Sequence, residues 1–371
     1  MLWRESEHEP VIDQAWTADR ALEALEEIVA DAETAASPDG LWPLHPRDEP
    51  EEEDEVWSGL YLGSAGMAWA LWKLGSAFDG ASAVANALER YRVRPDFMQD
   101  PHPPSLPCGE TGILVAAERI ASPLADRQRL RELIHANRAH PTWEWLWGSP
   151  GSMAAARAFG LEEEWRESAE LLWAQWDEET DLWTQHLYGH VVQSLGPGHG
   201  LASNVHALRG FVTEDVLRER AARVLERLAL RDHGLVNWPP APGDELLKIR
   251  VQWCHGAPGI ISTIGDLLPW ELALEGGELT WRAGPLRKGP GLCHGTAGNG
   301  YAFLRLHALT GDRMWLDRAR RFAVHAVHQV RSERAAVGHG RYTLFTGDIG
   351  VALYLRACLD EDPAFPIIDA L

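Results

Sequence analysis

Cysteine is scarce in this chain, and long hydrophobic runs are missing. The 371 residues contain four cysteines, at positions 108, 254, 293 and 358, which is too few for a disulfide framework in a chain of this size. No apolar run is long enough to span a bilayer, and the first residues are acidic and lack the apolar segment of a signal peptide. We therefore expect no membrane insertion, and a reducing cytoplasm in which the thiols stay free.

Lysine is scarcer still. It occurs only at positions 73, 248 and 288, arginine supplies the remaining positive charge, and the formal net charge is −21. Such a charge argues against nucleic acid or an anionic membrane as a partner. The densest acidic run, residues 48–55, is expected to form a solvated loop.

A glycine motif that recurs seven times stands out against these absences. Each copy reads Gly-x-x-Gly, or Gly-x-x-Ser in one case, and opens a stretch of small and apolar residues; the copies begin at Gly63, Gly109, Gly148, Gly200, Gly256, Gly295 and Gly347. Stretches that are apolar on most faces are typical of buried helices. A leading glycine permits a tight turn and a close approach of two backbones.

Amphipathic segments lie between the glycine motifs. Apolar residues recur with helical spacing among charged ones in residues 19–35, 127–136, 161–176, 212–230 and 312–331, which is typical of half-exposed helices. A unit of one outer and one buried inner helix can bury the inner helix only against neighbouring units. The pattern predicts an all-α fold: a single α/α toroid over residues 1–371, with seven outer and inner helix pairs and the glycine turns at one end. Strand signals are few, and at most a short hairpin is expected at residues 338–345.

Two of the glycine motifs are preceded by a cysteine and a histidine. Cys254-His255 precedes Gly256, and Cys293-His294 precedes Gly295. Two thiolates and an imidazole suit Zn²⁺, and three protein ligands leave the fourth position open, as in catalytic zinc sites. Two packed core cysteines beside turn glycines would give the same pattern, and spacing alone does not separate these two interpretations.

Taken with the seven glycine turns, these motifs resemble the LanC-like family, the lanthionine synthetase C proteins and their eukaryotic relatives, along the whole chain. The most specific motifs are residues 108–112, 198–202, 253–259 and 291–299. The resemblance implies that Cys254, Cys293 and His294 are zinc ligands. It also implies addition of a thiol to dehydroalanine or dehydrobutyrine. The thiol is a peptide cysteine in the cyclases, which form thioether rings, and glutathione in the eukaryotic members.

The resemblance suggests further active-site residues. His199 matches a histidine that is not a zinc ligand and would give a proton to the enolate, and Arg250 matches a basic residue that steadies developing charge. His255 stands where cyclases often carry tyrosine. Glu144 stands where cyclases carry an aspartate, and either acid could orient His199. Without the motifs, residues of these types would more often be solvated or structural.

A basic cluster characterises the glutathione-adding members of the family. Arg4 and Lys288 match two of its positions, whereas Arg341 matches the third only across a gap. Thr346 is a second departure, because an acidic residue is common there. The resemblance thus implies that a small thiol such as glutathione is held by Arg4, Lys288 and Arg341.

Several functions remain open at this stage. The leading hypothesis is a zinc-dependent enzyme that adds glutathione or a related thiol to dehydroamino acids in a peptide or protein substrate. A lanthipeptide cyclase is the alternative, and a non-catalytic scaffold that binds zinc and glutathione is a second alternative, against which His199 and Arg250 argue. A toroid hydrolase or terpenoid-type cyclase would need paired carboxylates, but Asp266 and Asp348 are isolated.

Overall fold

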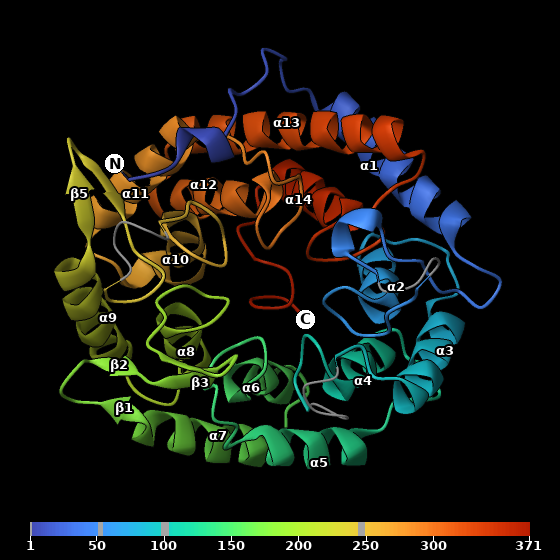
Figure 1. The fold of residues 1–371 in the computed structure, drawn as a ribbon, viewed down its shortest axis with the longest axis horizontal. Helices are drawn as coiled ribbons and strands as arrows, with labels where there is room; N and C mark the ends of the chain where they lie inside the picture. The colour runs from blue at the N-terminus through green and yellow to red at the C-terminus, as the bar shows by residue number, and fades with distance from the viewer. Residues whose placement is uncertain (1, 51–54, 98–103, 244–248) are drawn as a thin grey trace.

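The computed structural model describes residues 2–50, 55–97, 104–243 and 249–371. Two concentric rings of helices surround a common centre (Figure 1). The inner ring consists of α2 (Ser64–Lys73), α4 (Glu110–Arg119), α6 (Ser149–Ala158), α8 (Leu201–Ala207), α10 (Ala257–Ile264), α12 (Thr296–Thr310) and α14 (Asp348–Asp360). The outer ring consists of α1 (Ala18–Ala35), α3 (Gly80–Val93), α5 (Arg127–Asn137), α7 (Glu162–Ala174), α9 (Glu214–Leu228), α11 (Trp270–Ala283) and α13 (Arg313–Val337). The predicted α/α toroid is confirmed.

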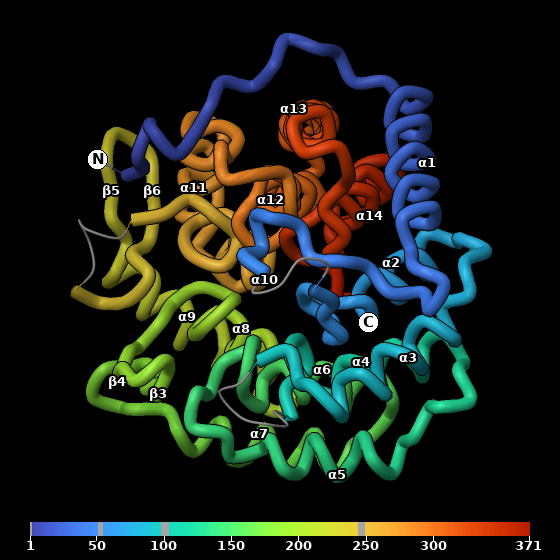
Figure 2. Tube along the Cα trace, turned by 45° about the vertical axis from the view of Figure 1, so that its right-hand side comes forward, coloured from blue at the N-terminus to red at the C-terminus, as the bar shows by residue number. Residues whose placement is uncertain are grey.

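The ring closes between the two ends of the chain. Each inner helix contacts the next one, and α14 contacts α2. Helix α1 packs against α14, the last inner helix; both views show α1 on the right of the ring (Figures 1 and 2). The N-terminal helix therefore covers the C-terminal one, so the outer layer is complete only when both ends of the chain are in place.

Every inner helix begins directly after the first glycine of its motif, at the same end of the ring. The N-cap residues are Gly63, Gly109, Gly148, Gly200, Gly256, Gly295 and Gly347. In most copies the second glycine lies directly under a backbone carbonyl six residues earlier. A Cβ atom on Gly112 would lie 2.1 Å from the Leu106 oxygen, and one on Gly298 would lie 1.7 Å from the Leu292 oxygen. A side chain therefore has no room at these positions.

The strands lie elsewhere than predicted. Three antiparallel hairpins form: β1 (Trp176–Asp177) with β2 (Leu182–Trp183), β3 (Gln185–Leu187) with β4 (His190–Val192), and β5 (Leu230–Asp232) with β6 (Leu235–Asn237). The hairpin expected at residues 338–345 is wrong. Gly338 ends α13 with φ +94°, and the Arg341 carbonyl accepts a bond from the Asp348 amide, so this segment forms the turn into α14. Short 3₁₀-helices occupy Glu5–Glu7, Pro46–Asp48 and Gly265–Leu267.

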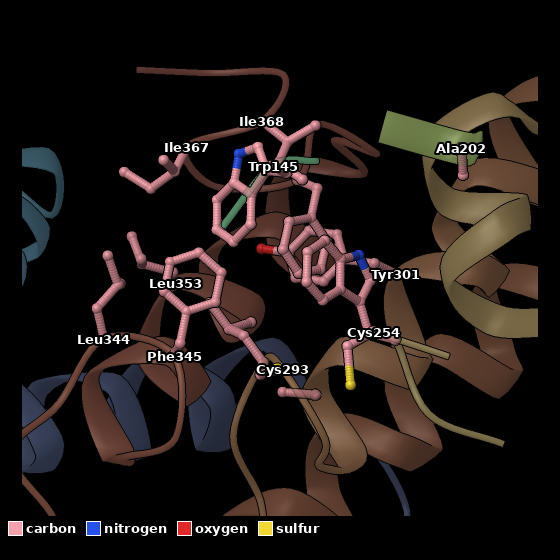
Figure 3. Packing of buried hydrophobic residues seen from close by; sticks show 14 of the residues in the cluster. Trp145, Ala202, Cys254, Cys293, Tyr301, Leu344, Phe345, Leu353, Ile367 and Ile368 are labelled. Carbon is pink, nitrogen blue, oxygen red and sulfur yellow. The ribbon is translucent and has the colours of Figure 1, made fainter. Parts of the chain in front are cut away.

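Aromatic side chains and the C-terminal segment fill the middle of the ring (Figure 3). Trp253 stacks on Phe365 with ring centroids 4.5 Å apart, and Trp145 lies 5.8 Å from Trp253 in an edge-to-face arrangement. Ile367 and Ile368 are buried in the same cluster. These side chains therefore close the middle of the ring beneath the glycine turns, and we call this layer the aromatic floor. No helix in the described part of the chain is long and apolar enough to cross a membrane.

The close contact under the second glycine gives a direct test of the fold. Gly112→Ala should lower the free energy of unfolding by about 3 kcal/mol, because the new Cβ would overlap the Leu106 carbonyl and the Leu60 side chain. Gly265→Ala is the matched control, since its Cβ would meet neighbours at an ordinary 3.5 Å, and it should be nearly neutral. Urea unfolding of both variants decides; equal stabilities would show that the glycine turns do not constrain the ring.

Candidate metal and thiol site

The predicted zinc ligands lie together at the glycine-turn end. One ligand atom each from Cys254, Cys293 and His294 lies within 4.8 Å of the other two. The turns before α10 and α12 supply them, and these turns are joined by a bond from the Cys254 amide to the Cys293 carbonyl, 3.1 Å long. Both cysteines belong to the hydrophobic cluster and each is 6% exposed; Figure 3 shows the sulfur of Cys254 pointing away from the aromatic rings.

The two thiols are close enough to share one proton. Their mutual hydrogen bond lowers the pKa of Cys254 and raises that of Cys293, because a negative charge on one sulfur disfavours a second charge beside it. Gln252 donates a hydrogen bond to the Cys254 sulfur at 3.0 Å. Tyr61 hydrogen-bonds Cys293, and burial raises the pKa of the Tyr61 phenol well above its usual value. A divalent cation would relieve the repulsion between two thiolates, so the donor set fits Zn²⁺.

Cys108 and Cys358 take no part in this cluster. Both are free and buried. Burial raises the pKa of Cys108 well above its usual value and that of Cys358 to about 12. They are packed thiols of the core.

His199 and Glu144 form a hydrogen-bonded pair beside the cysteines. The His199 Nδ1 atom lies 3.0 Å from Glu144 Oε2, and Glu144 also accepts bonds from the Leu146 and Trp147 amides, so its orientation is fixed. Burial lowers the pKa of His199. The hydrogen bond that His199 donates to Glu144 and the negative charges of Glu144 and Cys254 together outweigh the effect of burial, so the net shift of the pKa is upward. His199 is therefore held more readily in its protonated form.

The loop that carries His199 is pressed against Cys254. A Cβ atom on Gly196 would lie 2.2 Å from the Cys254 carbonyl oxygen, and one on Gly198 would lie 2.9 Å from the Cys254 Cβ. Side chains at these two positions would push the loop away. The glycines before α8 therefore set the distance between the histidine and the cysteine.

His255 and Arg250 lie close to His199. The rings of His255 and His199 are 5.6 Å apart, and burial lowers the pKa of His255 to about 4, which leaves it neutral at pH 7. The His255 Nδ1 atom is buried and has no hydrogen-bond partner among the described residues. Arg250 is exposed, and its charge lowers the pKa of both histidines. The four residues predicted to be catalytic thus interact with one another through His199, beside Cys254.

The three cations predicted to hold the thiol are placed differently from one another. Lys288 is exposed, and its charge acts on Cys293 in the direction of a lower pKa. Arg341 is buried and bonded through its Nε atom to both Asp48 carboxylate oxygens, at 3.0 and 3.1 Å. Its guanidinium is thus already paired with a buried carboxylate.

Asp48 also corrects the interpretation of the acidic run. Its side chain is 1% exposed, and it accepts a hydrogen bond from Thr346 at 3.1 Å. Glu55, at the other end of the run, is buried as well. The Asp48 and Glu55 side chains are therefore buried, whereas Glu49 is exposed as predicted, and residues 51–54 lie outside the described residues. A carboxylate thus does lie beside position 346, where the family often has an acidic residue, but Asp48 of a distant loop supplies it.

The N-terminal segment runs beside the loop that leads to Lys288. The Glu7 carbonyl accepts a bond from the Arg287 amide at 3.0 Å, and the Leu2 carbonyl accepts one from Asn237, which also bonds the Arg250 carbonyl. Arg4 pairs with Glu7 at 3.3 Å and has further contacts. The backbone contacts of the N-terminal segment thus place Arg4 between the segments of Arg250 and Lys288.

Sequence reasoning missed three polar residues at this end of the ring. Tyr61 and Gln252 each stand two residues before a motif residue, Gly63 and Cys254 respectively, which was the available signal. Asp48 gave none, because a carboxylate within an acidic run looks solvated until its partner is located.

Comparisons with known proteins agree with this architecture. The family model for lanthionine synthetase C-like proteins matches residues 55–369. A LanC-like protein of Arabidopsis thaliana, GCL1, is 32% identical over 191 residues, which cover 48% of this chain and 43% of the plant protein. A zebrafish (Danio rerio) protein named glutathione S-transferase LANCL1 is 37% identical over 141 residues, 36% of this chain and 34% of that protein. The matches thus span less than half of these relatives.

Among solved structures, nisin cyclase has a similar fold. It superimposes with a TM-score of 0.58 at 16% identity, and the match covers 94% of this chain and 99% of the cyclase chain. With the family match over residues 55–369, the ring of glycine turns and the Cys254, Cys293 and His294 cluster, the chain belongs to the lanthionine synthetase C-like family.

Proposed function

We propose that the protein is a zinc-dependent enzyme that adds a small thiol, such as glutathione, to dehydroalanine or dehydrobutyrine residues of a peptide or protein. The observation that carries this proposal is the position of the His199–Glu144 pair beside the Cys254, Cys293 and His294 cluster. A group of metal-ligand residues beside an oriented, protonatable histidine is an arrangement for proton transfer during a reaction. A scaffold that only binds zinc would not need it.

Zinc held by Cys254, Cys293 and His294 would supply a Lewis acid that lowers the pKa of a thiol and so increases its nucleophilicity. Tyr61 and Gln252 would hold the two cysteine sulfurs in place through their hydrogen bonds. Hydrogen bonds to ligand atoms typically tune a metal site. The aromatic floor below the cysteines excludes water from one side.

The reaction is a balanced addition. The thiol releases its proton to solvent, its sulfur forms a bond to the β-carbon of the dehydro residue, and His199 adds a proton to the α-carbon and regains one from solvent, with no leaving group. The electrons of the carbon–carbon double bond move toward the carbonyl, and the charge of Arg250 stabilises the enolate that results. His199 then donates its proton to the α-carbon, and Glu144 keeps the ring oriented and its protonated form favoured.

The choice of thiol rests on local charge. With a net charge of −21, the protein repels an anionic tripeptide unless cations lie at the binding site. Lys288 is an exposed cation whose charge acts on Cys293, and Arg4 lies on the neighbouring N-terminal segment. The name of the zebrafish relative, a glutathione S-transferase, supports the same thiol. Ring closure by a cysteine of the peptide is the alternative.

The metal is tested by content analysis. The purified protein should contain about one zinc per chain, and Cys293→Ala should lose most of it, because a three-ligand site would keep two. Cys358→Ala removes an equally buried thiol away from the cluster and should keep its zinc. Elemental analysis of the wild type without zinc, or unchanged zinc in Cys293→Ala, would contradict the assignment.

The proton donor is tested by kinetics. His199→Ala should keep zinc but lose roughly 10²–10⁴ in the rate of thiol addition, because general-acid assistance is worth about that much. Glu144→Gln should lower the pKa of His199. The alkaline limb of the pH–rate profile, where the proton donor loses its proton, should therefore shift to lower pH than in the wild type. The exposed His328→Ala is the control. Mass spectrometry of a dehydroalanine peptide gives the rates; if His199→Ala matches the wild type, His199 is not the donor.

The thiol is tested by comparing two nucleophiles. Lys288→Ala should raise the KM for glutathione by up to about fivefold and change the reaction with uncharged β-mercaptoethanol much less, because an exposed charge pair contributes up to about 1 kcal/mol. Lys73→Ala is the control, since Lys73 ends α2 away from the glycine turns. Equal effects on both thiols would mean that Lys288 is structural, and would favour a cysteine of the peptide substrate as the nucleophile.

A further inference from the structure

The β3–β4 hairpin lies over the His199 side of the candidate site. At its tip, Tyr188 lies 6.2 Å from the His199 ring in an edge-to-face arrangement, and its hydroxyl accepts a hydrogen bond from Trp147 Nε1 at 3.0 Å. The backbone amide of Trp147 also donates a hydrogen bond to the Glu144 carboxylate. The hairpin tip is thus attached to the same turn that orients the proton donor.

The tip holds an aromatic residue in a strained conformation. Tyr188 has φ +52° and Gly189 has φ +76°, so both central residues of this two-residue turn are left-handed. Asn or Gly normally occupies the first of these positions, and a left-handed conformation costs another residue roughly 1–2 kcal/mol. Tyr188 is nevertheless 52% exposed, so most of its ring gains little from burial. The β5–β6 turn holds His233 and Gly234 in the same conformation, so what distinguishes Tyr188 is its position beside His199.

One edge of the hairpin is open. The turn makes Leu187 and His190 the hydrogen-bonded pair, so the backbone groups of the next pair, His186 and Val191, point away from the hairpin. On the β3 side this edge is covered, because the His186 amide donates to the Pro141 carbonyl at 3.0 Å. On the β4 side, no described residue outside the hairpin bonds the backbone of Val191. The Val191 side chain is 67% exposed.

The other hairpins expose no apolar strand edge, because the exposed residues of β5, Arg231 and Asp232, are charged. Strand β6 is buried along its whole length, and both residues of β2 are buried. Most other large exposed apolar side chains are scattered over helices, whereas Tyr188 and Val191 lie three residues apart on one hairpin. An exposed apolar strand edge is normally blocked by a charge, a proline or a covering element unless it binds something.

We infer that β4 is the docking edge for the peptide substrate. An extended segment of the substrate pairs with the outward N–H and C=O groups of Val191 as a third strand, with its dehydro residue directed past Tyr188 toward His199. Main-chain pairing of this kind accepts many sequences, which suits a reaction defined by a dehydro residue rather than by its neighbours. This inference rests on the proposed function, since it names how the acceptor of that reaction is held.

The test compares two acceptors with the same thiol: a dehydroalanine peptide long enough to pair with β4, and N-acetyldehydroalanine methyl ester, which cannot pair. Val191→Pro removes the outward N–H without touching the pairing between β3 and β4. It should lower the ratio of kcat/KM for the peptide to that for the ester by about tenfold, the size expected for one hydrogen bond. Val191→Thr keeps the N–H and the branched shape and should keep the ratio.

A second variant guards against misfolding of the hairpin. Tyr188→Asn suits the left-handed turn but loses the hydrogen bond from Trp147, so the thermal stability should change little while the same ratio falls. A purely structural role would move stability and ratio together. An unchanged ratio in both Val191→Pro and Tyr188→Asn would overturn the inference. A wild type that is a dimer, with Val191→Pro monomeric, would also overturn it, by showing that a second copy covers the edge. No wild-type activity with either acceptor would instead reject the proposed function.

Discussion

The contact between a glycine and a backbone carbonyl at the start of the inner helices is the constraint on which the rest of the structure depends. Gly112 and Gly298 lie so close to the Leu106 and Leu292 carbonyls that a Cβ would overlap them. The repeated contact fixes where each inner helix begins and gathers the preceding loops at one end of the ring. The alternation of outer and inner helices brings seven loops to this end, the glycine contacts hold them close, and the candidate site consists of side chains from those loops.

The chemistry follows from which loops meet. The turns before α10 and α12 carry the cysteines and His294, and the loop before α8 carries His199. Gly196 and Gly198 let that loop approach Cys254, and Glu144 from the turn before α6 fixes the ring of His199. Four consecutive inner helices thus contribute to one site, and the hydrophobic floor made by Trp145, Trp253 and Phe365 closes it from below.

Much of the fold could be predicted from the sequence, because the glycine motif repeats and the apolar stretches after it are unmistakable. The zinc ligands and His199 could be located through the same motifs. Contacts between distant loops could not. The buried pair of Arg341 and Asp48 joins two segments that no pattern connects, so Arg341 was expected to be open and Asp48 solvated. The hairpins were missed because each strand has only two or three residues, too few for alternation to show.

The central claim is that His199 delivers a proton to the α-carbon from one fixed side during thiol addition. The configuration of the product measures this most directly. The wild-type reaction with a dehydroalanine peptide and glutathione in D₂O should give one deuterium at the α-carbon and a single configuration there, determined by chiral analysis of the hydrolysed thioether amino acid. A mixture of both configurations, as free solution produces, would contradict the account, because it would show that the proton comes from solvent and not from the site.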